Sequence, residues 1–121
     1  MNKVRLYGTA DADGALTVVG TKAIDGYIRK VRWIDGTFAD GVDAVISVTN
    51  ADSDETILTL TDANIDASYY PRVVVHSEAG VALTGTSGGD RQSPFVVGTP
   101  KLVVADGGNG GIGGCIIFFE E

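Results

Sequence analysis

The chain has 121 residues, 44% of them hydrophobic and 21% charged, and a net charge of −7 at pH 7. This composition is too apolar for a disordered chain, and no apolar run reaches the roughly 18 residues of a membrane-spanning helix. The acidic balance argues against a nucleic-acid partner, because Lys and Arg supply most of the affinity for phosphates. Arg29, Lys30 and Arg32 nevertheless gather three of the nine basic side chains. We expect one domain over residues 1–121 that binds neither membrane nor nucleic acid.

Cysteine and histidine are scarce, with one of each in the chain. Cys115 cannot form an internal disulfide, and with His76 as the only other soft ligand the chain lacks a zinc-binding set. Residues 1–7 enter an alternating pattern directly, without the apolar centre and cleavage site of a secretory signal. These observations predict a buried Cys115, no cofactor and no metal, in a protein that folds in the cytoplasm.

Short segments rich in β-branched residues, bounded by Gly, Asp, Asn or Thr, recur about every ten to fifteen residues and predict strands. The first is residues 3–7, whose alternation places Val4 and Leu6 on a buried face. Residues 11–14 form a turn-rich tetrapeptide ending in glycine. We therefore expect residues 3–7 and 15–19 to pair as a hairpin.

Residues 27–34 alternate again, with one face formed by Tyr27, Arg29, Val31 and Trp33. Val31 and Trp33 are expected to face inward, and the opposite face, with Lys30 and Arg32, to be solvated and basic.

The middle of the chain predicts a second hairpin, between residues 44–49 and 56–60, joined by a polar loop. In residues 61–68, Thr61 or Asp62 could cap a short helical turn.

Further strand candidates are residues 72–76, 95–97, 101–105 and 115–119. The last three are apolar on both faces, which is typical of strands covered twice. The complete pattern predicts an all-β, single-domain antiparallel β-sandwich or jelly roll of eight to nine short strands.

The final strand also predicts self-association. Ile117, Phe118 and Phe119 lie almost at the C-terminus, and both faces of this strand need cover from the domain, from a neighbouring subunit, or from both. We expect a homo-oligomer with these three residues at the interface.

Two glycine motifs match enzyme fingerprints without the surrounding structure. Residues 108–113 fit G-x-G-x-x-G, but the sequence that follows reads as a strand and not as the helix that binds a pyrophosphate. Residues 85–89 fit the G-x-S-x-G of hydrolases around Ser87, but the only histidine, His76, precedes it and no helix follows. Residues 106–114 are interpreted as a flexible or tightly wound connection. We expect no catalytic and no cofactor-binding residue.

Carboxylate clusters offer oxygen ligands for calcium: Asp11 with Asp13, Asp40 with Asp43, and Asp52 with Asp54 and Glu55. None follows the twelve-residue calcium loop, so we interpret them as solvated turns. The aromatic side chains that could stack on a sugar ring are Trp33, Tyr69 and Tyr70.

The C-terminal half carries a family resemblance. Residues 68–72 place two tyrosines before a proline, and residues 83–109 combine a run of small residues, the adjacent Asp90 and Arg91, and two strands. From residue 68 to 121 the chain resembles a group of small virion proteins of tailed bacteriophages, similar to head decoration or cement proteins. The resemblance implies a trimeric β-sandwich or jelly roll of the virion, made in the host bacterial cytoplasm. Its implied partners are the major capsid protein or other virion proteins, and it brings no catalytic residues.

Carried onto this chain, the resemblance marks a subunit or capsid contact at Tyr69, Tyr70, Arg72, Asp90 and Arg91. Tyrosine and arginine are enriched at binding hot spots. The alternative is that Arg72 and Asp90 or Arg91 only pin a loop. Other functions that fit are a neck, tail or head-fibre component and a carbohydrate-binding β-sandwich module, with an enzyme least favoured.

Overall fold

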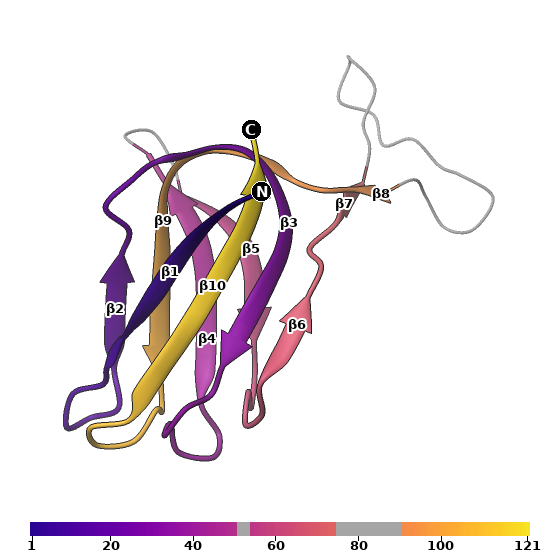
Figure 1. Cartoon of the computed structure of the whole chain (residues 1–121). Helices are drawn as coiled ribbons and strands as arrows, with labels where there is room; N and C mark the ends of the chain where they lie inside the picture. The colour runs from indigo at the N-terminus through magenta and orange to yellow at the C-terminus, as the bar shows by residue number, and fades with distance from the viewer. Residues whose placement is uncertain (51–53, 75–90) are drawn as a thin grey trace.

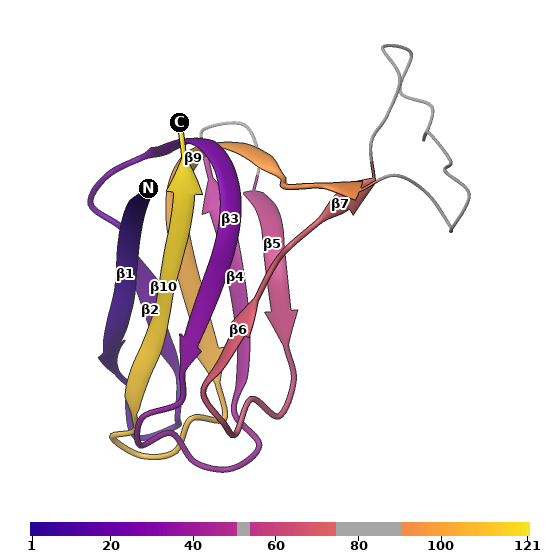
Figure 2. The same cartoon turned by 45° about the vertical axis from the view of Figure 1, so that its right-hand side comes forward.

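The computed structural model describes residues 1–50, 54–74 and 91–121, and these contain no helix. Two antiparallel sheets lie face to face (Figures 1 and 2). The front sheet has the strand order β1 (Asn2–Thr9), β10 (Ile112–Glu120), β3 (Ile24–Ile34) and β6 (Ala67–Tyr69). The back sheet has the order β2 (Leu16–Val19), β9 (Phe95–Ala105), β4 (Asp43–Thr49) and β5 (Asp54–Leu60).

The sheets are joined along one corner, where the first residues of β3, Ile24 to Tyr27, pair with Gly98 to Phe95 of β9. In the described residues β1 and β2 form no ladder, so the sandwich is not closed into a barrel. Along the chain the eight strands lie front, back, front, back, back, front, back, front, which is the connectivity of a jelly roll. The prediction of an all-β antiparallel sandwich or jelly roll is confirmed.

The core fills the space between the sheets with alternate side chains of each strand. Leu6, Val31 and Trp33 come from the front sheet and are fully buried, as the alternation predicts. The Trp33 ring stacks on Phe38 with centroids 5.7 Å apart, and its Nε1 donates to the carbonyl of Ala63 over 2.9 Å.

Cys115 is also fully buried, as predicted. Burial raises the pKa of its thiol to about 12, so the residue acts as a small core side chain.

The predicted N-terminal hairpin is wrong, although its turn exists. The Asp11 carboxylate accepts hydrogen bonds from the backbone N–H of Asp13 and Ala15, and Gly14 has φ 80°. However, β1 pairs with β10 and β2 pairs with β9, so the turn carries the chain from one sheet to the other. The same turn can join two strands of a hairpin or connect two sheets. Here the long strands β10 and β9 pair with β1 and β2, so the turn connects the sheets.

The strict alternation predicted for residues 27–34 fails at a β-bulge. Phe118 lies opposite Lys30 and Phe119 opposite Ile28, which leaves Arg29 as the extra residue. The bulge places Arg29 outside the core together with Lys30, and Ile28 inside. Tyr27 is 40% exposed and does not share the inward face of Val31.

The other middle elements divide into one confirmed and one wrong prediction. The β4–β5 hairpin is confirmed. The helical turn in residues 61–68 is wrong, because Asp62 has φ 51°, outside the helical region, and Ala67 already pairs with Trp33 as part of β6.

The segments predicted as strands 95–97 and 101–105 are one strand, β9, which continues through Gly98. Gly98 has φ 147°, and a Cβ there would lie 2.6 Å from the carbonyl oxygen of Thr49, so only glycine fits without strain. Residues 106–111 form a tight turn with Asp106, Gly108 and Gly110 at positive φ. The G-x-G-x-x-G run therefore leads into β10 and not into a helix.

Candidate interaction surfaces

The first surface is a short arm, residues 70–74 and 91–92, whose strands β7 (Val73–Val74) and β8 (Arg91–Gln92) pair away from the sandwich (Figures 1 and 2). Tyr70, at the start of the arm, is 59% exposed, and Arg72 and Arg91 are exposed. The Arg72 guanidinium donates only to the adjacent carbonyl of Pro71, over 2.7 Å, within the described residues. The arm thus presents aromatic and cationic side chains at a distance from the body.

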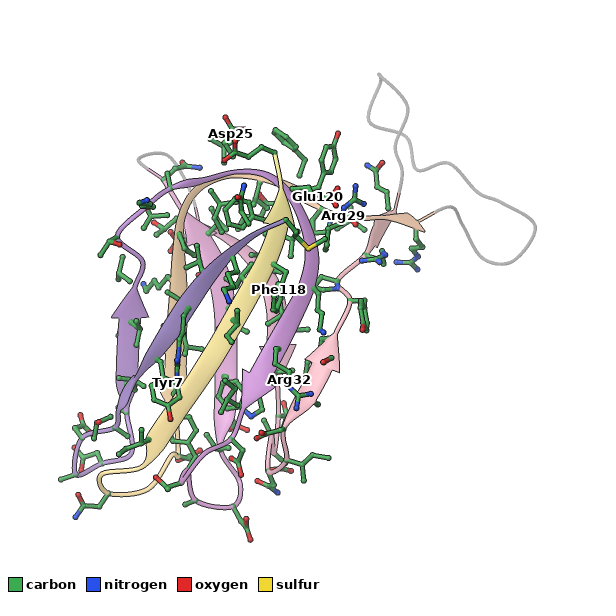
Figure 3. All side chains as sticks on the ribbon, viewed as in Figure 1. Tyr7, Asp25, Arg29, Arg32, Phe118 and Glu120 are labelled. Carbon is green, nitrogen blue, oxygen red and sulfur yellow. The ribbon has the colours of Figure 1, made fainter. Side chains whose placement is uncertain are left out.

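Arg29 fixes the base of this arm. Its Nη1 donates to the buried Ser93 Oγ over 3.1 Å, and its Nη2 lies 3.0 Å from Glu120 Oε2 in an ion pair. The backbone N–H of Ile28 also donates to the carbonyl of Pro94 over 2.9 Å. Figure 3 shows Arg29 and Glu120 together at the end of the sandwich from which the arm projects. Sequence reasoning missed this role because the bulge reverses the direction expected for Arg29.

The structure divides the residues that the resemblance marked. Tyr69 belongs to β6, lies opposite Val31 and packs half-buried against the core. Tyr70, Arg72 and Arg91 belong to the arm, so they can act together in a contact that does not include Tyr69. Asp90 lies outside the described residues, as do Ser87 and His76.

The three predicted interface residues of the last strand also separate. Ile117 is fully buried and Phe119 is 6% exposed, because both point into the core of the same chain. They are not placed for contact with a partner. Phe118 points outward and is half-buried, so it alone of the three can meet another molecule.

The second surface is the outer side of the front sheet, here called the front face. The strand register puts Lys3, Phe118 and Lys30 in one row, and Arg5, Ile116 and Arg32 in the next. Neighbouring strands lie about 4.8 Å apart, so the two columns of cations are about 10 Å apart. An apolar strip on β10 therefore runs between two cationic columns. Figure 3 labels Phe118 of the strip and Arg32 of one column.

The four cations of the front face have no carboxylate partner in the described chain, and three of them contact polar or aromatic side chains. The Arg5 guanidinium carbon lies 4.4 Å from the centroid of the Tyr7 ring, and Lys30 Nζ lies 5.4 Å from that of Phe118. Arg32 Nη1 donates to Ser68 Oγ over 3.2 Å. The sole ion pair of the described residues is the one at the arm base, so the charge of this face is uncompensated.

The third surface is the loop end, the four connections at the lower end of the sandwich in Figure 1: residues 10–15, 35–42, 61–66 and 106–111. Hydrogen bonds join these loops, among them Asp35 N–H to the Asp66 carboxylate over 2.8 Å and Ala39 N–H to the Gly107 carbonyl over 2.9 Å. The loops contain no Lys, Arg or His and carry seven aspartates: Asp11, Asp13, Asp35, Asp40, Asp62, Asp66 and Asp106.

Asp35 shows that these carboxylates are crowded. Burial raises its pKa above the ordinary 3.8, and the nearby charges of Asp66 and Asp40 raise it further. One carboxylate oxygen of Asp35 is buried without a hydrogen-bond partner in the described part of the chain. Positive charge from outside would relieve this crowding.

Other features of the described residues offer little for chemistry. No group of three or more His, Cys, Asp or Glu is arranged there to hold a metal, and the Asp11 and Asp43 carboxylates accept backbone N–H groups. A shallow cleft of about 390 Å³ lies between the edges of β1 and β2, lined by Lys3, Arg5 and Lys22 among others. Trp33 is fully buried and cannot stack on a sugar.

Comparison with protein-family models, with curated proteins and with solved structures found no match for this chain. In the described residues no helix is long and apolar enough to cross a membrane.

Proposed function

We propose that this chain is a structural protein of a bacteriophage particle, most specifically a head decoration protein that stabilises the capsid through protein–protein contacts. The observation that carries the proposal is the arm, which presents Tyr70, Arg72 and Arg91 outside the sandwich. Tyrosine and arginine dominate binding hot spots, since each contributes large contact area and directional hydrogen bonds. Jelly rolls also build many viral capsid domains.

The base of the arm supports a role in docking. Arg29 ties Ser93 to Glu120 of the C-terminal strand, so the chain that enters β9 is anchored on the sandwich. An edge-to-face aromatic pair lies beside it: Tyr27 and Phe95, with centroids 5.0 Å apart, are 40% and 51% exposed. A fixed base with exposed aromatic rings lowers the entropy lost when a partner binds.

Two alternatives remain as proposals. A neck, tail or head-fibre component would use the same arm on a different virion partner. A carbohydrate-binding module would depend on Tyr70, because the buried Trp33 cannot contribute a stacking surface.

The test is binding of the purified chain to expanded capsids of a phage that encodes it. We expect saturable binding that raises the melting temperature of the capsid, and a loss of at least about tenfold in affinity for Tyr70→Ala combined with Arg72→Glu. The control is Lys101→Glu, which makes the same charge change on the back sheet. No binding to capsids, or saturable glycan binding lost with Tyr70→Ala, would contradict the decoration role.

A further inference from the structure

We propose that the front face binds the loop end of a second copy of this chain, and that repetition of this end-to-side contact builds a small ring. The proposal specifies the self-association of the proposed virion protein and leaves the arm for the capsid. It follows from the distribution of charge, from the apolar groups of the two surfaces and from their placement on the sandwich.

Charge divides the molecule into complementary regions. The seven aspartates of the loop end equal the whole net charge of −7, so the remaining nine carboxylates are balanced by the nine Lys and Arg. Four of those nine cations lie together on the front face without a carboxylate partner in the described residues. Contact between the two surfaces places opposite charges together, which steers association and fixes its register.

The apolar groups match as well. Ile65 lies in the loop end and is 73% exposed, and the same loop carries Asp62 and Asp66. On the front face Ile116 and Phe118 form an apolar strip between two columns of cations about 10 Å apart. An apolar knob flanked by acids therefore meets an apolar strip flanked by bases.

Like-charge repulsion excludes the symmetric arrangements. Two front faces would bring eight uncompensated cations together, and two loop ends would bring fourteen aspartates together. A copy that stands end-on against the front face of another leaves its own front face free, so the contact is heterologous and continues until it closes into a ring or extends as a filament. The loop end lies across one end of the strands, whereas the front face runs along them (Figures 1 and 2), so each copy turns relative to the previous one and a small closed ring is favoured over a straight filament.

A nucleic acid is a weaker match for the front face. The chain as a whole repels a polyanion, and four cations release few counterions. A phosphate backbone also leaves the apolar strip and Ile65 without a partner.

The decisive experiment is a charge swap followed by light scattering after size exclusion. We expect the unmodified chain to form a small ring, and Arg5→Glu with Arg32→Glu to weaken association at least about tenfold. Asp13→Lys with Asp40→Lys on the loop end should do the same. The two variants should bind each other when mixed, since the unchanged loop end of the first fits the unchanged front face of the second. Ile65→Ala should also weaken association, whereas Val19→Ala, at another exposed apolar site, 54% exposed on β2, should not.

Several results would overturn the proposal. These are a monomeric unmodified chain at all concentrations, an oligomer that survives both charge reversals, and two variants that do not bind each other although both remain folded. Binding of a single-stranded oligonucleotide that depends on Arg5 and Arg32, with the oligomer unchanged, would assign the front face to nucleic acid instead. Capsid binding is read separately with the arm variants, so the two proposals fail independently.

Discussion

The two outward faces of this sandwich have the same secondary structure, but their side chains differ in charge and length. The two central rows of the front face hold four cations around Ile116 and Phe118. The corresponding rows of the back face hold one, Lys101, among short side chains: Thr17, Val19, Val45, Ser47, Thr56, Thr59 and Val103. Val and Thr are the residues that a half-buried pleated surface favours for folding alone.

The difference between the two faces indicates which of them serves a purpose besides folding. Long cationic side chains lose more rotamer entropy on ordering than Val or Thr, and adjacent like charges repel. The front face carries both costs in a chain that has an excess of acids. A role in binding explains why the front face carries these two costs, whereas a strand face that only meets solvent does not need them.

The largest expected effect is a difference in the free energy of unfolding between substitutions on the two sides of β10. Phe119 points into the core and Phe118 to the front face, although they are adjacent on β10. Phe119→Ala should lower the free energy of unfolding by about 3–5 kcal/mol through lost burial and a cavity. Phe118→Ala should lower it less, by about 1–2 kcal/mol, because its ring is only partly buried and leaves no closed cavity. Urea denaturation measures both, and equal losses would mean that the two residues share one environment.

The next effect concerns association. Phe118→Asp should leave the chain folded, yet weaken the oligomer at least about tenfold by placing a charge in the apolar strip. Val103→Asp is the matched variant on the back face, where Val103 is 37% exposed, and should leave the oligomer unchanged. Analytical ultracentrifugation with circular dichroism checks both. A back-face variant that dissociates the oligomer would reverse the roles of the two faces.

Much of this contrast could be predicted from the sequence. Alternation predicted Val31 and Trp33 inside, the β4–β5 hairpin, and the sandwich or jelly roll, because period-two burial is a local property. A basic outer face around Lys30 and Arg32 was also expected from residues 27–34. The sequence did not predict that Lys3 and Arg5 join it, because that depends on β1 pairing with β10, more than a hundred residues away.

The remaining errors have the same origin. The turn at residues 11–14 is compatible with a hairpin or with a crossover between sheets, and only the distant partners β9 and β10 decide. The bulge at Arg29 is set by its register against Phe118 and Phe119, and it moves Arg29 to the base of the arm. The loop end forms from four segments that are far apart in the sequence, so its concentration of negative charge could not be predicted from the order of residues.

Salt should weaken the front-face contact selectively. Raising the ionic strength from 0.1 to 1 M shortens the Debye length from about 10 to about 3 Å, so the attraction between the cationic columns and the aspartates is screened. We expect the oligomer to dissociate several-fold more readily at the higher salt, with the free energy of unfolding of the monomer nearly unchanged. An oligomer insensitive to salt would show that apolar contact alone holds it, and would weaken the role given to Lys3, Arg5, Lys30 and Arg32.

The smallest effect tests the loop end itself, through Asp35. Its pKa in the folded chain lies above the ordinary 3.8, because of burial first and then the charges of Asp66 and Asp40. A raised folded pKa favours the folded state below the unfolded pKa, and this contribution is lost as the pH rises through the folded pKa. At pH 7 the ionised Asp35 therefore destabilises the monomer. Asp35→Asn should raise the stability of the monomer at pH 7. The gain should vanish at about pH 3 and below, where Asp35 is mostly protonated in both the folded and the unfolded state.

This measurement is made on the Phe118→Asp background, at a concentration where that variant is monomeric, with urea denaturation at several pH values. Asp25→Asn, at the opposite end of the sandwich, is the control and should give no such gain (Figure 3). In the oligomer, cations of the neighbouring front face would lie against the loop end and lower the pKa of Asp35 again. The gain from Asp35→Asn should therefore be smaller in the ring than in the monomer. An equal gain in both would place Asp35 outside the contact, even if the rest of the loop end binds.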